Sequence, residues 1–435
     1  MYFPVAFQVL FLLLLVAFGW GANLRYLSLA GIEVRPILQL SQLPMAARGD
    51  GTSACNDGLR RGVFGLAVLF SGISLVGWSL CLAFSMSPAM QTCIALITYM
   101  VIISALVVPQ RILFHTARMQ LLHSLARIVK PSLSDPVYLS DVIMADILTS
   151  CARIFSDILL VACTFSSLFW HSRRRSLGTD YDGGIAEYVE SQRSAKMCTD
   201  AGVVGAMLVA MPYIFRLRQC VNEYLRSTAG SSDAKRHFAN AVKYASSIPV
   251  ICLSSAQKRA AVDGTMETKY SDWALRLVYG LWILAVAFNS LYSYYWDIAF
   301  DWNLGHLSDG TKLSDLVAPT QPGGNSDSSD ALGIGGAACD GENVNIGSLD
   351  AEEGRAWKAS KFPLFLRPQL RFGSPQIYYA AMLIDFLLRI TWTAKLTSYI
   401  HIDLMAYGGF WLNVLEIYRR WQWTFLRIEK EVSVS

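Results

Sequence analysis

Charged residues are scarce in this chain. Asp, Glu, Lys and Arg make up only 16% of its 435 residues, whereas 53% are hydrophobic, and the mean hydropathy is +0.36. Soluble domains carry about 25% charged residues. The composition therefore excludes an ordinary soluble protein and indicates that the lipid bilayer is the main solvent.

Several familiar motifs are also missing. The nine cysteines show no CxxC spacing and the six histidines form no ligand set, so we expect no metal site, no cofactor and no disulfide framework. No nucleophile and base are paired as an enzyme would need. The net charge of +4 is spread over the loops without a polybasic run, which argues against nucleic-acid binding. The first apolar run lacks the basic start of a signal peptide, so we expect a retained first span.

Long apolar stretches recur from end to end. A spanning helix needs about 20 mainly apolar residues. Stretches that meet this test occur at 4–20, 62–84, 90–108, 142–170, 199–217, 240–256, 273–298, 376–400 and 403–425. The sequence therefore predicts an all-α fold, a polytopic transmembrane helical bundle of nine spans.

Two further stretches differ from the spans. Residues 111–130 mix leucines with basic residues such as Arg118, which predicts a helix at the membrane interface with its basic side chains directed to headgroups. Residues 303–350 are rich in Gly, Ser, Asp and Asn, which predicts a disordered loop.

Charged residues also occur inside the predicted spans, where each costs a few kcal/mol and usually faces a bundle interior. In 376–400, Asp385, Arg389 and Trp392 share one helical face. The pair Asp385 and Arg389 could simply neutralise itself during insertion. Tryptophans in such positions are more often interfacial anchors than gates.

The last span repeats the pattern. Glu416 comes four residues before Arg420, whereas Arg419 points about 100° away from Arg420, so the two arginines could serve two directions. Further along, Arg427 and its acidic neighbours Glu429 and Glu431 are typical of a solvated helix end.

Acidic and basic groups in the other spans could complete a cluster. Asp297 and Asp301 share a face and could balance the arginines, while Trp296 and Trp302 beside them suit an interfacial belt.

Two more spans carry charge. In 142–170, Asp146 and Arg153 are seven residues apart and are predicted to face the same way. Lys243 and Tyr244 begin 240–256, which Pro249 interrupts, and broken helices are common at transporter substrate sites.

The buried cations outnumber the acids of their own helices. A divalent oxyanion would suit such a cage, because guanidinium groups bind phosphate bidentately and Lys adds a point charge. The residues concerned are Lys243, Arg389, Arg419 and Arg420.

Five ordered segments carry a resemblance to a known family. They are RLRQCVNEYLRS (216–227), HFANAVKYASSIPVI (237–251), NSLYSYYWDIAFDWNL (289–304), YYAAMLIDFLLRITWTAKL (378–396) and EIYRRWQWTFLRIEKE (416–431). They resemble the signatures of the EXS domain, shared by retrovirus receptor-type phosphate exporters and the yeast protein of ER-retention-defective type. The resemblance implies N-terminal transmembrane helices at 1–198, an EXS domain at 199–431 and a tail at 432–435, and it would allow a tenth span.

The resemblance also implies a site and a location. The exporters carry an N-terminal SPX domain, whereas this chain begins with its first span, as in the Golgi-located ER-retention-defective branch. Matched motif by motif, the phosphate pathway would use Asp146, Lys243, Tyr244, Asp297, Asp301, Arg389, Arg419 and Arg420, with Trp392 as a gate. The resemblance assigns no role to Asn289 or to the long connection 303–375.

Two hypotheses remain open at this point. The first is a Golgi membrane transporter that moves inorganic phosphate from the lumen to the cytosol and thereby supports glycosylation. We expect such a transporter to form a homodimer and to cycle between the Golgi and the ER. The second is a membrane adaptor that retains Golgi glycosyltransferases by binding a sorting partner through a loop or through the tail 426–435 (LRIEKEVSVS).

Overall fold

The computed structural model describes residues 4–38, 52–83, 88–130, 132, 135–176, 203–262, 272–305, 365–367, 370–391 and 403–434. Within these ranges the regular elements are all helices and no strand occurs, which confirms the all-α class. The elements in chain order are α1 (Val5–Leu29), α2 (Val34–Ile37), α3 (Thr52–Ala83), α4 (Pro88–Val107), α5 (His115–Val129), α6 (Leu139–Ser150), α7 (Ala152–Ser176), α9 (Val203–Arg226), α10 (Ser232–Ala245), α11 (Ser247–Val262), α13 (Asp272–Trp296), the π-helix η2 (Asp297–Asp301), α16 (Pro375–Arg389) and α17 (Asp403–Val434).

Membrane-spanning helices account for much of this architecture. Five helical stretches of the described chain are long and apolar enough to cross a bilayer, and they lie in α1, α3, α4, α9 and α13 with η2. The bent pair of α6 and α7 adds a sixth if it counts as one span. The protein is thus a polytopic helical membrane protein, as predicted. The predicted span 240–256 is divided between the shorter helices α10 and α11, and 403–425 falls in the more charged α17. The predicted span 376–400 is described only as far as residue 391.

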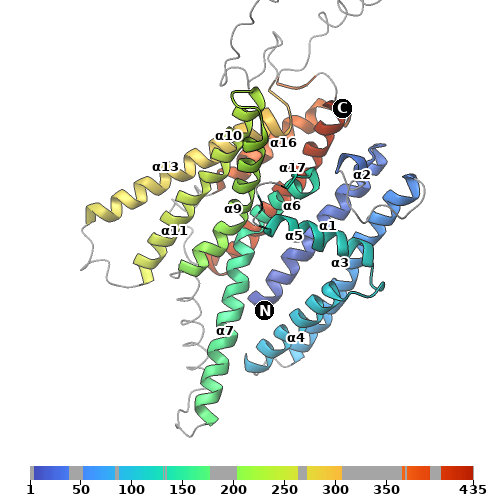
Figure 1. Cartoon of the computed structure of the whole chain (residues 1–435). Coiled ribbons are helices and arrows are strands. Elements are labelled where there is room, and N and C mark those ends of the chain that lie inside the picture. The colour runs from blue at the N-terminus through green and yellow to red at the C-terminus, as the bar shows by residue number, and fades with distance from the viewer. Residues whose placement is uncertain are drawn as a thin grey trace, which may run out of the picture.

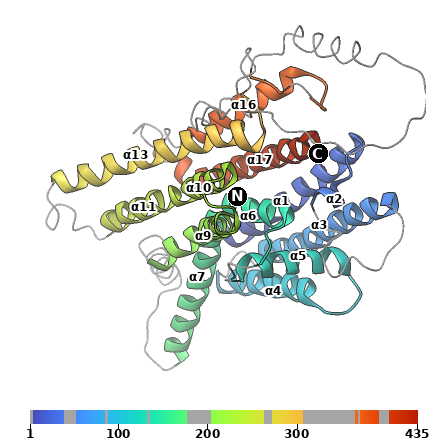
Figure 2. The same cartoon turned by 45° about the horizontal axis from the view of Figure 1, so that its top comes forward.

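Two helices, α1 and α17, lie at the centre of the bundle. α1 packs against α3, α7 and α17, and α17 in turn packs against α6 and α16 (Figure 1). α3 and α4 lie together on one side of this centre, while α11 and α13 run side by side on the other (Figure 2). Charged side chains from α6, α9, α10, α16 and α17 can therefore meet inside the bundle.

Two predicted spans are broken. The stretch 142–170 bends by 58° where α6 gives way to α7 at Cys151. The stretch 240–256 breaks at Ser246 and not at Pro249, which instead sits in the first turn of α11, where a proline costs no helical hydrogen bond. Asn289, which had no assigned role, holds this second break: its Oδ1 accepts hydrogen bonds from Ser246 and Ser247 at 2.9 and 3.1 Å.

Arg118 of α5 does not point toward headgroups, as was expected of the basic residues in 111–130. Its side chain is fully buried and donates to six backbone carbonyls, among them those of Ala105 and Leu106 at the end of α4. Carbonyls at a helix C-terminus lack intrahelical partners and carry partial negative charge. Arg118 therefore fastens the turn between α4 and α5.

Two more expectations are wrong. Trp296 and Trp302 are not interfacial, because only 2% and 1% of their surfaces are exposed, and Trp302 donates from Nε1 to the Trp423 carbonyl at 3.3 Å. The expectation of no disulfides is also wrong, because Cys163 of α7 is disulfide-bonded.

Replacing Arg118 with Met should destabilise the protein by about 3–5 kcal/mol, because it leaves the buried carbonyls around it without a donor. Thermal unfolding of the purified protein in detergent measures the loss. Arg111→Met, on an exposed arginine just before the same helix, is the matched control and should leave the midpoint unchanged. Equal midpoints for the two variants would contradict the fastening role.

Candidate functional site

Asp297 lies at the centre of a buried cluster of charges. Its side chain has no exposed surface, and its carboxylate meets Lys243 Nζ at 2.9 Å, the Arg389 guanidinium, and Arg419 Nη1 at 3.6 Å. Asp297 begins the π-helix η2, a rare form that is often found at functional sites. The same turn brings Asp301 to 3.2 Å from Lys243. The two acids thus share a face, as their spacing predicted, but the cation they share is a lysine.

Asp385 forms the second acidic position. It accepts from Arg389 Nε at 3.0 Å, the predicted pairing four residues apart, and from Arg419 Nη1 at 3.2 Å. The pair is not isolated, because Arg389 also contacts Asp297 and Arg419 also contacts both acids. η2, α16 and α17 are thus joined by one set of charges.

The expected pairing of Glu416 with Arg420, four residues later, is wrong. Glu416 binds Arg419, three residues away, at 2.9 and 2.5 Å, and does not pair with Arg420. Arg420 points the other way, donating to Ser150 at 3.0 Å and Thr149 at 3.3 Å and lying 4.6 Å from the centre of the Trp423 ring. The side chains of Arg419 and Arg420 therefore point in different directions, as predicted. Arg420 is buried and has no carboxylate within ion-pair distance among the described residues.

Asp146 pairs with an arginine that the sequence did not assign to it. Arg216 of α9 donates from Nε at 2.8 Å, and the Tyr244 hydroxyl donates at 2.6 Å. The predicted partner Arg153 lies beyond the bend at Cys151 and is exposed. In the sequence, Arg216 appeared only as the first residue of the segment RLRQCVNEYLRS (216–227). Its place inside an apolar helix was the signal that could have singled it out.

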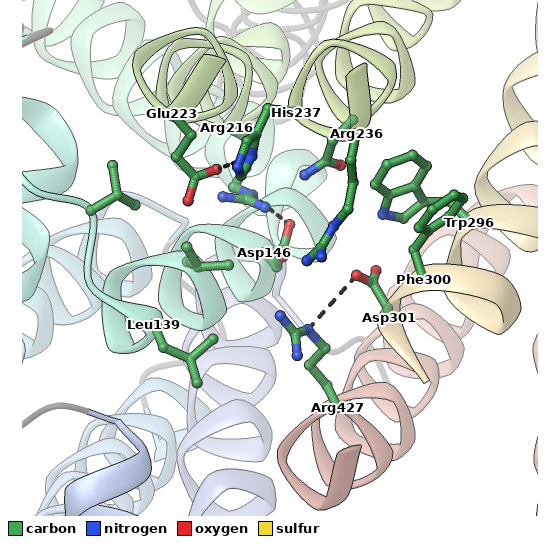
Figure 3. A pocket seen from close by; sticks show the side chains of 13 residues that line it. Leu139, Asp146, Arg216, Glu223, Arg236, His237, Trp296, Phe300, Asp301 and Arg427 are labelled. Atoms are coloured by element: carbon green, nitrogen blue, oxygen red, sulfur yellow. Dashed lines mark hydrogen bonds and ion pairs between the residues drawn. The ribbon is translucent and has the colours of Figure 1, made fainter. Parts of the chain in front are cut away.

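Asp146, Arg216 and Asp301 border a pocket of about 180 Å³. Figure 3 shows Arg216 joined to Asp146 on one side and Arg427 joined to Asp301 on the other, with Arg236 of α10 reaching between the two acids. Arg236 has no carboxylate within ion-pair distance in the described chain. The sequence did not mark Arg236, because it lies outside the predicted spans.

The end of α17 is buried, so its prediction as a solvated helix end is wrong. Arg427 and Lys430 are each 9% exposed and Glu429 is fully buried. Glu429 accepts from the Arg371 backbone N–H at 2.8 Å, from the Tyr378 hydroxyl, and from Arg367 at 2.5 Å. These contacts tie the segment before α16 to α17.

Glu431 lies at this end of α17, beyond the predicted spans. Burial alone would raise the pKa of Glu431, but Arg427 and Lys430 hold it at about 2. Glu431 therefore keeps its charge at neutral pH and accompanies Arg427, which faces the pocket.

A family model named EXS family matches residues 3–433. The chain belongs to the EXS family. The match includes residues on both sides of the expected boundary at 198/199, and that division stays a prediction.

Curated relatives of this EXS protein agree with the match. It is 28% identical over 233 residues to Protein ERD1 of Kluyveromyces lactis, covering 52% of this chain and 46% of the relative. It is 25% identical over 379 residues to the xenotropic and polytropic retrovirus receptor 1 homolog of Xenopus laevis, covering 85% and 42%. It is 22% identical over 334 residues to phosphate transporter PHO1 homolog 8 of Arabidopsis thaliana, covering 76% and 32%. The chain thus spans about half or less of the length of these relatives.

Eight predicted site residues of the EXS protein lie in or beside one network. Asp146 reaches Tyr244, whose ring lies 5.6 Å from Lys243 Nζ, and Lys243 continues to the acids of η2. The predicted gate Trp392 lies outside the described residues. The members are Asp146, Lys243, Tyr244, Asp297, Asp301, Arg389, Arg419 and Arg420.

This ion network differs from the cage of unpaired cations that the sequence predicted. Most of its cations already have acidic partners, and those partners come largely from other helices. Among the described residues, no group of three His, Cys, Asp or Glu side chains could hold a metal ion. The arrangement is a balanced ion network with two buried or pocket-facing arginines, Arg420 and Arg236, that lack acids.

Asp297→Asn should destabilise the EXS protein by about 3–5 kcal/mol, because it leaves buried cations without their shared acid. Thermal unfolding in detergent gives the shift. The double variant with Lys243→Met removes one surplus charge and should recover part of the loss. Asp233→Asn, on the exposed first turn of α10, serves as the control. A double variant no more stable than Asp297→Asn would argue against the charge balance.

Proposed function

We propose that this EXS protein is a phosphate transporter of the Golgi membrane that moves inorganic phosphate from the lumen to the cytosol. The observation that carries the proposal is the pocket in which Arg216, Arg236 and Arg427 converge at the edge of a buried ion network. Charged residues are kept inside membrane proteins mainly where they serve a pathway or a partner charge.

The proposed ligand is matched by the two unpaired arginines. A guanidinium group can hold two phosphate oxygens at once, and it keeps its charge at any physiological pH. Arg236 reaches into the pocket, and Arg420 is buried on α17, where it lies over the Trp423 ring and donates to the Ser150 and Thr149 hydroxyls. In this proposal phosphate binds first near Arg236 and then approaches Arg420.

The acids have a separate role in the proposal. Asp297 and Asp301 hold Lys243 at 2.9 and 3.2 Å, so an entering anion competes with carboxylates for the same cation. Such competition keeps binding weak enough for release, which conduction requires. Trp392, three residues after Arg389 in the sequence, would act as the gate.

The relatives support the substrate and the location. One is named a phosphate transporter, and another is named Protein ERD1, in line with the ER-retention-defective branch. Phosphate set free by glycosylation in the lumen is the source we propose, so retention of glycosyltransferases would depend on transport indirectly. The adaptor hypothesis gains no support from the tail, because Leu426, Ile428 and Glu429 are buried within α17.

Phosphate flux in proteoliposomes tests the proposal. Uptake of labelled phosphate by vesicles holding the purified protein should exceed uptake by empty vesicles. Arg236→Ala and Arg420→Ala should each lower it at least about tenfold, as expected when a charge-assisted contact worth about 1.5–3 kcal/mol is lost. Arg226→Ala, on the exposed end of α9, is the control and should transport normally.

The outcomes separate the hypotheses. Phosphate flux no greater than in empty vesicles would contradict the transporter hypothesis. Flux that is unchanged in both Arg236→Ala and Arg420→Ala would contradict only the assignment of the site. In cells, the Arg420→Ala protein should also mislocalise glycosyltransferases. Mislocalisation by a variant with normal flux would favour the adaptor.

A further inference from the structure

An arginine in the middle of a broken span is exposed. Arg153 is the second residue of α7, just past the bend that joins α6 and α7 into one candidate span. In the described chain its side chain makes no hydrogen bond and no ion pair. Charged residues at membrane depth almost always face a bundle interior or a water-filled cavity. The exposure of Arg153 at this depth therefore indicates that water lies beside it.

Gly409 of α17 gives the Arg153 side chain its place. A Cβ at Gly409 would lie 3.0 Å from Arg153 Nη2, which is closer than most contacts of a real Cβ atom. The guanidinium group therefore lies against the backbone of α17, where glycine leaves room for it. α17 packs against α6, while α7 runs away from the bundle centre after the bend (Figure 1). The Arg153 side chain thus reaches from α7 to α17.

One face of α17 is polar from Gly409 to the charged pocket. Asn413, Glu416 and Arg420 follow Gly409 at intervals of four, three and four residues, so they lie on one side of the helix. Arg427 continues this side two turns later and borders the pocket. The polar face therefore runs from the pocket, past the buried Arg420, to the part of α17 that contacts α7.

Two groups on this face are open to a ligand. Asn413 is 7% exposed, yet its amide stays accessible and has no hydrogen-bond partner in the described chain. The Glu416 side chain is 35% exposed, although that of its partner Arg419 is only 5% exposed. Glu416 also accepts from Ser150, the last residue of α6, at 2.8 Å. The ion network is thus open to water at Glu416, close to the bend beside Arg153.

We propose that Arg153 binds a phosphate group at a second mouth of the pathway, on the far side of Arg420 from the pocket that Arg236 enters. This inference rests on the proposed transport of phosphate. A guanidinium group binds two phosphate oxygens with parallel hydrogen bonds, and in the described chain Arg153 has no acid to release first. The Asn413 amide can donate a further hydrogen bond. Arg153 would thus receive the anion at the end of the polar face of α17.

A phosphate group at Arg153 has two possible sources, free phosphate and a lipid headgroup. The continuous polar face of α17 favours free phosphate, because a headgroup is tied to chains that need apolar surroundings. Both sources offer the same oxygen atoms to the guanidinium group. They differ in whether inorganic phosphate alone occupies the site.

Reaction of introduced cysteines with a membrane-impermeant methanethiosulfonate tests whether water reaches Arg153. In proteoliposomes, Arg153→Cys should react at least about tenfold faster than Ile158→Cys, because the reactive thiolate forms in water and not in lipid. Ile158 is the matched control, since it is an exposed apolar residue of the same helix. The unmodified protein gives the background from its own cysteines.

Protection by phosphate tests binding at Arg153. Gly409→Cys places a thiol next to the Arg153 guanidinium group. Millimolar inorganic phosphate should slow the labelling of this thiol at least about twofold, as expected when half or more of the sites are occupied. The protection should be lost when Gly409→Cys is combined with Arg153→Gln. Protection by dioctanoylphosphatidic acid but not by inorganic phosphate would assign the site to a lipid headgroup and overturn its place in the pathway.

Phosphate flux tests whether the site serves transport. Arg153→Gln should raise the phosphate concentration for half-maximal uptake by proteoliposomes at least about tenfold, because it removes a charge-assisted contact. Arg153→Lys keeps the charge and should raise this concentration less. Thermal unfolding in detergent shows that each variant is folded.

Three further results would overturn the proposal. They are equal labelling of Arg153→Cys and Ile158→Cys, protection by phosphate that survives Arg153→Gln, and half-maximal uptake that is unchanged in Arg153→Gln. If the unmodified protein carries no phosphate, the proposed transport fails. Labelling and protection would then still show whether Arg153 faces water and binds phosphate, because neither measurement depends on flux.

Discussion

A carboxylate without any contact with solvent organises the middle of this bundle. Asp297 is surrounded by cations from α10, α16 and α17, and each of those helices carries a charge that would be costly to bury alone. The helices therefore depend on one another for electrostatic reasons as well as for packing. The π-helix that begins at Asp297 is the local irregularity that lets one short turn present two acids to the same lysine.

Charge balance across helices changes the picture of a phosphate pathway. A cage of free arginines would bind a dianion tightly and release it slowly. Here most cations already have acidic partners, so in the proposed transport a phosphate anion would exchange one set of partners for another. Arg420 and Arg236 stand at the two places where the exchange can begin without breaking an ion pair.

Much of the site followed from the sequence, because burial of charge in an apolar segment is visible without a structure. The spacing of Asp385 and Arg389 predicted their contact, and the adjacency of Arg419 and Arg420 predicted their divergence. The pairing of Asp146 did not follow, since the bend at Cys151 separates it from Arg153 and no proline or glycine marks that bend. Glu429 was misjudged for a similar reason: its partners lie about sixty residues earlier in the chain, beyond any periodic pattern.

The long connection between η2 and α16 is closed at its base. The Gly305 backbone N–H donates to the Phe365 carbonyl at 2.8 Å, and Arg367 donates to the Trp302 carbonyl at 2.8 Å. The two ends are therefore fixed beside each other by contacts within the bundle, whatever the chain between them does. Closing a longer loop costs little more entropy than closing a shorter one. The connection is thus a place where evolution or an experimenter can insert or remove sequence, including a whole folded reporter domain, without changing how the spans pack.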